Sequence, residues 1–150
     1  MNVSVFNSLH ELSYRVLLLL YIHGSEKVSV DRLTALDYIT VYGNDFGISH
    51  ENLHGNNRFR FSEYAGRRKS INEALKSLVL IGYIQFHSLK RGFLYSITQT
   101  GQQVCKTLND SYASKYIENG KMAISFADEM SDRELTKAIN KYSIFIAQEG

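Results

Sequence analysis

The fold is decided by one stretch of the chain, Leu78–Gly101, which reads LVLIGYIQFHSLKRGFLYSITQTG. Before Gly82 the apolar residues keep the spacing of a helix, and this glycine suits a left-handed helix end. After it the apolar spacing changes to two, which predicts strands over 83–86 and 93–97 with a turn over 89–92. The stretch therefore predicts a helix that is followed at once by a tight hairpin.

Two helices are predicted upstream of this stretch. The first starts at Ser8, whose spacing to Glu11 is that of a capping box, and it stops at Gly24. Its second half is apolar on all sides, so we expect it to run through the core. The second covers about 29–42, with its apolar residues on one face, and Gly43 ends it.

A long polar connection separates the second helix from the third. Residues 44–62 are glycine-rich with weak periodicity, and loops of that length are usually functional or mobile. The third helix, which ends at Ile81, starts at about Ser62 or at Ser70, where Ser70 and Glu73 have the spacing of a capping box. A short separate helix over 63–68 is then an alternative.

More helix follows the hairpin. The pattern predicts helices over about 100–110 and 112–130, and a last helix that begins with a capping box of Ser131 and Glu134.

Three helices, a hairpin and further helix are the element order of a winged helix-turn-helix domain. The predicted fold class is thus α+β and mostly helical, with a two-stranded wing. We expect residues 1–110 to form the winged-helix domain and residues 111–150 a C-terminal helical extension packed on it.

Composition narrows the class of protein. The 150 residues are 44% hydrophobic and 21% charged, which is typical of globular chains. The longest apolar run, Val16–Ile22, is far short of the ~20 residues of a membrane span and makes a poor secretory signal. The single cysteine, Cys105, excludes an internal disulfide and favours a cytoplasmic location. It lies on a predicted helix face and is interpreted as a core residue.

The net charge of +2 conceals an uneven distribution. Residues 58–106 carry nine basic and two acidic side chains, whereas acidic residues are in excess on both sides. In a winged helix the third helix enters the major groove and the wing contacts the DNA backbone. The candidate nucleic-acid or partner-binding residues are Arg58, Arg60, Arg67, Arg68, Lys69, Lys76, Lys90 and Arg91. The alternatives are an acidic protein surface as the partner, or no partner and a solvated basic face.

A zinc-protease string, H-E-x-x-H, occurs at His50–His54. Zinc catalysis needs both histidines on one face of a stable helix, with the glutamate as the base. Gly47 and Gly55 bracket the string closely, so we expect a polar loop in which His54 forms structural hydrogen bonds. A zinc peptidase remains a third hypothesis.

Two charged residues interrupt apolar helix faces. Arg15 lies on the first predicted helix and Asp37 on the second. They either form a partly buried ion pair or reach solvent independently.

A series of short motifs occurs in order along nearly the whole chain: Phe6-Asn7-Ser8, Glu11-Leu12, Arg15, Leu17 to Leu20, Leu36-Asp37-Tyr38, Leu53-His54, Arg67-Arg68 to Gly82, Tyr112-Ala113 and Ser131-Asp132 with Leu135. In this order they resemble the middle components of ABC-three-component systems. The family is similar to the small subunits of Lamassu-type bacterial anti-phage systems, which also contain an ATPase of the SMC/Rad50 kind and an effector, often a nuclease.

The resemblance implies a small accessory subunit of a defence complex. It would bridge the SMC-like ABC ATPase and the effector nuclease, and it could contact double-stranded DNA. No catalytic residue, metal or cofactor comes with the resemblance, so we expect no enzyme activity. The alternative function is a dimeric winged-helix transcriptional regulator that binds a palindrome.

Overall fold

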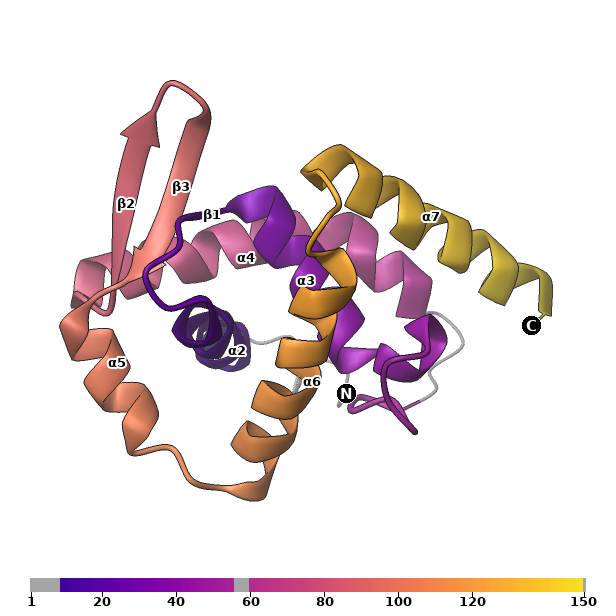
Figure 1. Ribbon diagram of the computed structural model, residues 1–150, viewed down its shortest axis with the longest axis horizontal. Helices are drawn as coiled ribbons and strands as arrows, with labels where there is room; N and C mark the ends of the chain where they lie inside the picture. Colours follow the sequence, from indigo (N-terminus) through magenta and orange to yellow (C-terminus); the bar gives the residue numbers. More distant parts are fainter. Residues whose placement is uncertain (1–8, 56–59, 150) are drawn as a thin grey trace.

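The computed structural model describes residues 9–55 and 60–149, and the side chains of 9–55 and 62–142 (Figure 1). Within these residues the chain forms a mostly helical α+β fold, which confirms the predicted class. The elements in chain order are α2 (Leu9–His23), β1 (Val28–Ser29), α3 (Val30–Val41), the 3-10 turn η1 (Gly43–Phe46), α4 (Arg60–Ile81), β2 (Ile84–Leu89), β3 (Gly92–Ile97), α5 (Gln99–Lys106), α6 (Ser111–Ala127) and α7 (Asp132–Glu149).

The first two helices lie where the sequence places them. The predicted capping residue Ser8 is outside the described residues. At the second helix Ser29 is the N-cap, and its Oγ accepts a hydrogen bond from the backbone N–H of Arg32 at 3.0 Å. This bond satisfies one of the backbone donors that every helix start leaves unpaired.

The third helix begins near the earlier of its two predicted starts, since α4 begins at Arg60, two residues before Ser62. α4 is continuous over 22 residues, so Ser70 lies inside the helix and neither begins it nor follows a separate helix. The serine–glutamate spacing that resembles a capping box also occurs by chance on a helix surface. Arg67, one turn earlier, is buried against Asp37, and this tertiary contact holds the first turns of α4 in place.

The hairpin follows the predicted change of period. Gly82 has a φ of +87°, the left-handed conformation in which glycine is favoured, and the chain turns from α4 into β2 there. β2 and β3 pair antiparallel from Ile84↔Ile97 to Leu89↔Gly92. The two-residue strand β1 completes a sheet of order β1-β3-β2 and is too short for sequence periodicity to reveal.

One apolar core joins all the helices. α2 passes through its centre, and its residues 16–20 are buried without exception. α6 and α7 cover α3, and α7 also contacts α4 (Figure 1). They bury Tyr116, Leu135 and Ile139 in the same cluster as α2 and α3. The C-terminal helices therefore complete the core of this chain.

The predicted capping box at the last helix is confirmed. The Glu134 carboxylate accepts from the backbone N–H of Ser131 at 2.8 Å, and Ser131 Oγ accepts from the N–H of Glu134 at 3.1 Å. The helix before it is capped by Asp110, whose carboxylate accepts from the N–H of Ala113. Among the described residues, no helix combines the length and the apolar character needed to cross a membrane.

A glycine in α5 allows this helix to pack closely against the ends of the hairpin strands. A Cβ at Gly101 would lie 2.1 Å from the carbonyl oxygen of Tyr83 and 2.8 Å from Ile97 Cγ1. We expect Gly101→Ala to lower the free energy of unfolding by about 1–3 kcal/mol, because the junction must open. Urea unfolding measures this effect.

The matched control is Gly66→Ala in the exposed part of α4. A Cβ there meets nothing within 4 Å, so helix propensity alone should stabilise this variant by up to about 1 kcal/mol. Equal stability of Gly101→Ala and the wild type would contradict the close approach.

Candidate functional site

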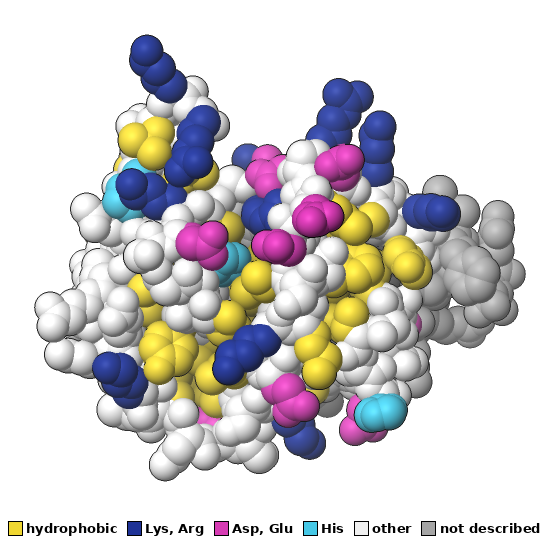
Figure 2. All heavy atoms as spheres, viewed as in Figure 1, with side chains coloured by type: hydrophobic (Ala, Val, Ile, Leu, Met, Phe, Trp, Pro, Cys, Tyr) yellow, Lys and Arg dark blue, Asp and Glu magenta, His cyan; other side chains and the backbone are white. Residues whose placement is uncertain are grey.

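The eight predicted basic residues fall into different environments. Arg58 lies outside the described residues, and Arg60 is described only as the first residue of α4. Those with exposed side chains are Arg68, Lys69, Lys76, Lys90 and Arg91. Figure 2 shows basic side chains gathered at the free end of the hairpin. The structure therefore brings part of the predicted set to the surface of α4 and the hairpin turn.

Arg67 is the exception, because its side chain points into the core. It is 3% exposed, and its guanidinium donates to Asp37 Oδ2 at 3.1 Å and to Glu63 Oε1 at 3.2 Å. The neighbouring Arg68 is exposed and donates to Asp31 Oδ1. The place of Arg67 in the surface set is thereby corrected: this residue serves the buried network.

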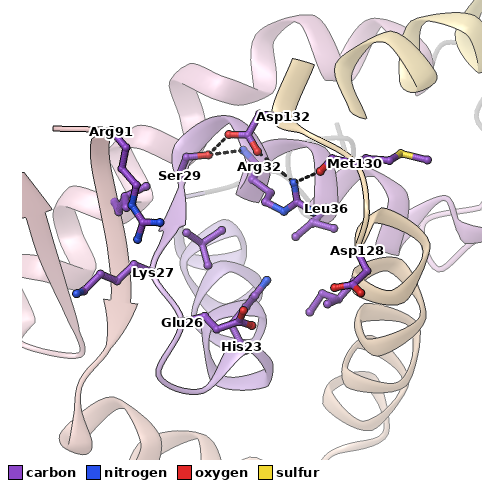
Figure 3. A pocket seen from close by; sticks show the side chains of 13 residues that line it. His23, Glu26, Lys27, Ser29, Arg32, Leu36, Arg91, Asp128, Met130 and Asp132 are labelled. Atoms are coloured by element: carbon purple, nitrogen blue, oxygen red, sulfur yellow. Dashed lines mark hydrogen bonds and ion pairs between the residues drawn. The ribbon is translucent and has the colours of Figure 1, made fainter. Parts of the chain in front are cut away.

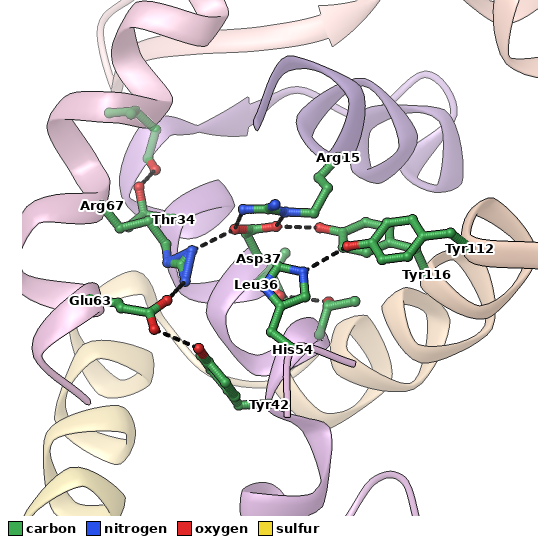
Figure 4. A network of polar contacts seen from close by, with 12 residues as sticks. Arg15, Thr34, Leu36, Asp37, Tyr42, His54, Glu63, Arg67, Tyr112 and Tyr116 are labelled. Atoms are coloured by element: carbon green, nitrogen blue, oxygen red, sulfur yellow. Dashed lines mark hydrogen bonds and ion pairs between the residues drawn. The ribbon is translucent and has the colours of Figure 1, made fainter. Parts of the chain in front are cut away.

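The buried network is centred on Asp37 (Figure 4). Arg15 donates to both carboxylate oxygens of Asp37, at 2.8 Å and 3.1 Å, which confirms the ion pair between the two helices. Tyr116 Oη donates to Asp37 Oδ1 at 2.6 Å. With Arg67 included, a single fully buried carboxylate joins α2, α3, α4 and α6.

Charge pairing decides the ionisation of this network. Burial alone would raise the pKa of Asp37, but Arg15 and Arg67 outweigh it and hold the pKa well below its usual range. The pKa of Tyr116 is raised by burial and by the adjacent carboxylate, so its hydroxyl stays protonated and donates. Because the folded pKa of Asp37 is depressed, its stabilisation is present at neutral pH and is lost as the pH falls below about 4.

Further polar side chains extend the network. Tyr42 Oη donates to Glu63 Oε2 at 2.7 Å, and His54 Nε2 shares a hydrogen bond of 2.8 Å with Tyr112 Oη. Burial, followed by the charge of Arg15, lowers the pKa of His54 to about 3. His54 is therefore neutral in the folded protein at physiological pH.

The H-E-x-x-H string does not have the geometry of a zinc protease. Residues 47–55 form turns and bends, so its histidines are not on one helix face. His50 is exposed, whereas His54 bonds to Tyr112 as the structural hydrogen-bonder that the sequence predicts. Within the described residues no group of three or more His, Cys, Asp or Glu could hold a metal ion.

Cys105 is a core residue, as predicted. It is 2% exposed, and burial raises the pKa of its thiol to about 12. The thiol is thus protonated and a poor nucleophile at neutral pH.

A polar hollow of about 400 Å³ lies between the end of α2, the hairpin and the link from α6 to α7 (Figure 3). Its walls carry both charge signs, from Lys27, Arg32 and Arg91 and from acidic residues such as Asp132. Arg32 donates to Asp132 and also to two carbonyl oxygens, that of Ala127 at the end of α6 and that of Met130 in the link to α7. Its guanidinium therefore fastens the α6–α7 link to α3.

Two functional residues of the structure, Tyr116 in the buried network and Arg32 beside the hollow, had no signal in the sequence. Tyr116 is one of ten tyrosines, and nothing in its spacing marks it as a ligand of Asp37. The role of Arg32 follows from main-chain oxygens some hundred residues away, which no local pattern encodes. Arg67 could have been found from the helical spacing to Glu63, with which it forms an i,i+4 pair.

Nearly the whole amino-acid sequence matches the model of one protein family. The sequence model for ABC-three component (ABC-3C) system Middle Component 2 matches residues 5–149. The chain belongs to this family. As an ABC-3C middle component it is a defence-related accessory subunit. No curated protein and no solved structure matches the chain.

The network predicts the cost of removing the central charge of this middle component. Asp37→Asn removes the carboxylate that faces Arg15 and one of the two carboxylates that Arg67 contacts, so we expect a loss of about 3–5 kcal/mol in the free energy of unfolding. Urea unfolding at pH 7 measures it.

The matched control is Asp31→Asn, which breaks the exposed pair with Arg68. Exposed ion pairs contribute less than about 1 kcal/mol, so this variant should be close to the wild type. Losses of similar, small size in both variants would contradict the central role of Asp37.

The His54 environment predicts a pH effect on stability. The unfolded chain binds a proton at His54 near pH 6.5, whereas the folded chain binds one only near pH 3. The contribution of His54 to the free energy of unfolding is therefore fully present above about pH 6.5. It decreases as the pH is lowered, by up to about 3 kcal/mol at pH 4. We expect His54→Gln to flatten this slope.

Urea unfolding at a series of pH values between 7 and 4 provides the measurement. His50→Gln, in the exposed half of the same string, should keep the slope of the wild type. A wild-type slope in His54→Gln would show that the histidine is not held neutral.

Proposed function

We propose that this middle component is a non-catalytic accessory subunit of a Lamassu-type bacterial anti-phage complex in the cytoplasm. In this proposal it bridges an ABC ATPase of the SMC/Rad50 kind and an effector nuclease. The observation that carries the proposal is the family match over residues 5–149, which covers nearly the whole chain. A subunit that is defined by its membership of a three-component system needs surfaces for other proteins.

The element order supports a winged helix-turn-helix as the framework. α2, α3 and α4 precede the β2–β3 hairpin, which takes the place of the wing. In this proposal residues 1–110 are the winged-helix domain and residues 111–150 its helical extension. Fold alone does not decide between DNA and protein as the partner.

The placement of the polar residues supports a subunit without catalytic activity. Asp37, Glu63 and His54 are engaged with neighbouring side chains of the core. The thiol of Cys105 is buried and protonated. These internal contacts support a structural role for the groups.

Contact with double-stranded DNA is a second part of the proposal. Lys69, Lys76 and Lys90 are exposed on α4 and at the hairpin turn, where winged helices meet DNA. Each phosphate contact releases counterions, so this binding would weaken steeply with salt.

Co-purification tests the bridging role. The tagged chain is expressed with the ATPase and effector components encoded beside it, and each is omitted in turn. We expect a ternary complex, and we expect the ATPase and effector to separate when this chain is omitted.

Two results would overturn the bridging role. In the first, the ATPase and effector associate equally well without this chain. In the second, the chain binds neither of them, forms a dimer and binds a palindromic duplex. The second result would support the transcriptional regulator instead.

A further inference from the structure

The hairpin presents an open sheet edge. In the order β1-β3-β2, strand β2 has one neighbour among the described residues, and Figure 1 shows no other element along its outer side. The register with β3 is unbroken over all six residues, so no bulge twists the edge away. The strand, IQFHSL, also lacks proline and charged residues, which proteins use to block pairing at an edge.

The hydrogen-bond register identifies the outward-facing backbone groups. The carbonyl oxygen of Tyr83 accepts from the N–H of Thr98 at 3.0 Å, one step below the first pair of the ladder. Bonding residues alternate in an antiparallel pair, so the odd-numbered residues of β2 bond to β3. Phe86 and Ser88 therefore direct their N–H and C=O groups away from the sheet.

An aromatic surface lies beside this edge. Phe86 is 44% exposed and Phe93 64%, and their ring centroids are 5.4 Å apart. Phe86 also contacts the ring of Tyr95, its partner across the ladder. Because directly opposite residues share a face, all three rings lie on one side of the hairpin. Exposed aromatic side chains of this size are typical anchors of protein interfaces.

The positive charge of the hairpin favours a partner with an acidic residue. Residues 83–98 contain Lys90 and Arg91 at the turn and no acidic residue. Nucleic acid would satisfy these two cations but would leave the aromatic rings and the outward backbone groups without partners. An extended peptide with alternating apolar residues and an acidic end satisfies all three features.

We propose that an extended segment of another component of the same system adds to β2 as a further strand. Its apolar side chains pack on Phe86 and Phe93, and an acidic residue near one end meets Lys90 at the turn, since Arg91 points into the hollow of Figure 3. This inference rests on the proposed function, since it names the chemistry by which the bridging subunit holds one partner.

Amide hydrogen exchange tests the strand addition most directly. The full chain is measured by NMR alone and with the purified ATPase component or the purified effector component. We expect one component to slow exchange at the Phe86 and Ser88 amides by at least about tenfold, because they become hydrogen-bonded. The amides of Gln85 and His87, already bonded to β3, should change little.

Substitutions at the edge provide an independent measurement. Ser88→Pro removes an outward N–H, which an edge strand tolerates, whereas Ser88→Ala keeps it. Phe93→Ser removes an exposed ring, and the matched control Met122→Ser removes a side chain of α6 that is 43% exposed. We expect the proline and Phe93→Ser variants to raise the Kd at least about tenfold, and the controls to stay within about twofold.

The outcomes separate this inference from the proposed function. If a component binds while Phe86 and Ser88 exchange freely and Phe93→Ser binds normally, strand addition is wrong and bridging stands. If neither component binds, both fail.

Protection that appears only with a DNA duplex, or only as the concentration of the chain alone rises, would overturn the inference in favour of nucleic acid or a second copy. Circular dichroism confirms that each variant folds, and the exchange experiment needs no variant.

Discussion

The carboxylate of Asp37 is the constraint on which the arrangement of the helices depends. It is fully buried, and it is bound at once by Arg15 of α2, Arg67 of α4 and Tyr116 of α6. Two guanidinium groups around one carboxylate leave an excess of buried positive charge, which Glu63 offsets from the next turn of α4. Apolar packing alone allows helices to slide, whereas these directional bonds fix which residues of four helices face one another.

The free end of the hairpin is exposed, whereas Ile84, Tyr95 and Ile97 belong to the apolar core. Ile84 and residues 94–97 of the hairpin are buried, while its outer half carries the exposed Phe86, the exposed Phe93 and the basic turn. A protein that used these residues for its own folding would bury them. The contrast between a rigid helical body and an apolar, unpaired strand edge supports a role in holding another protein.

The sequence predicted most of the architecture because its signals are local. The change of period at Gly82 and the box at Ser131 and Glu134 both depend on residues that are close in the chain. The same local logic could not choose between Ser62 and Ser70 as the start of α4, where the distant contact of Arg67 with Asp37 favours the earlier one. It also placed Arg67 on the surface, because a run of three basic residues looks solvated until Asp37 is known to lie opposite. The polar network and β1 depend on contacts far apart in sequence.

A cryo-electron microscopy map of the reconstituted three-component complex would test the bridging role and the strand addition together. We expect this chain to lie between the ATPase and the effector, with density for a strand of one of them continuing the sheet beside β2. A map in which the hairpin faces solvent, or in which this chain contacts only DNA, would contradict this expectation.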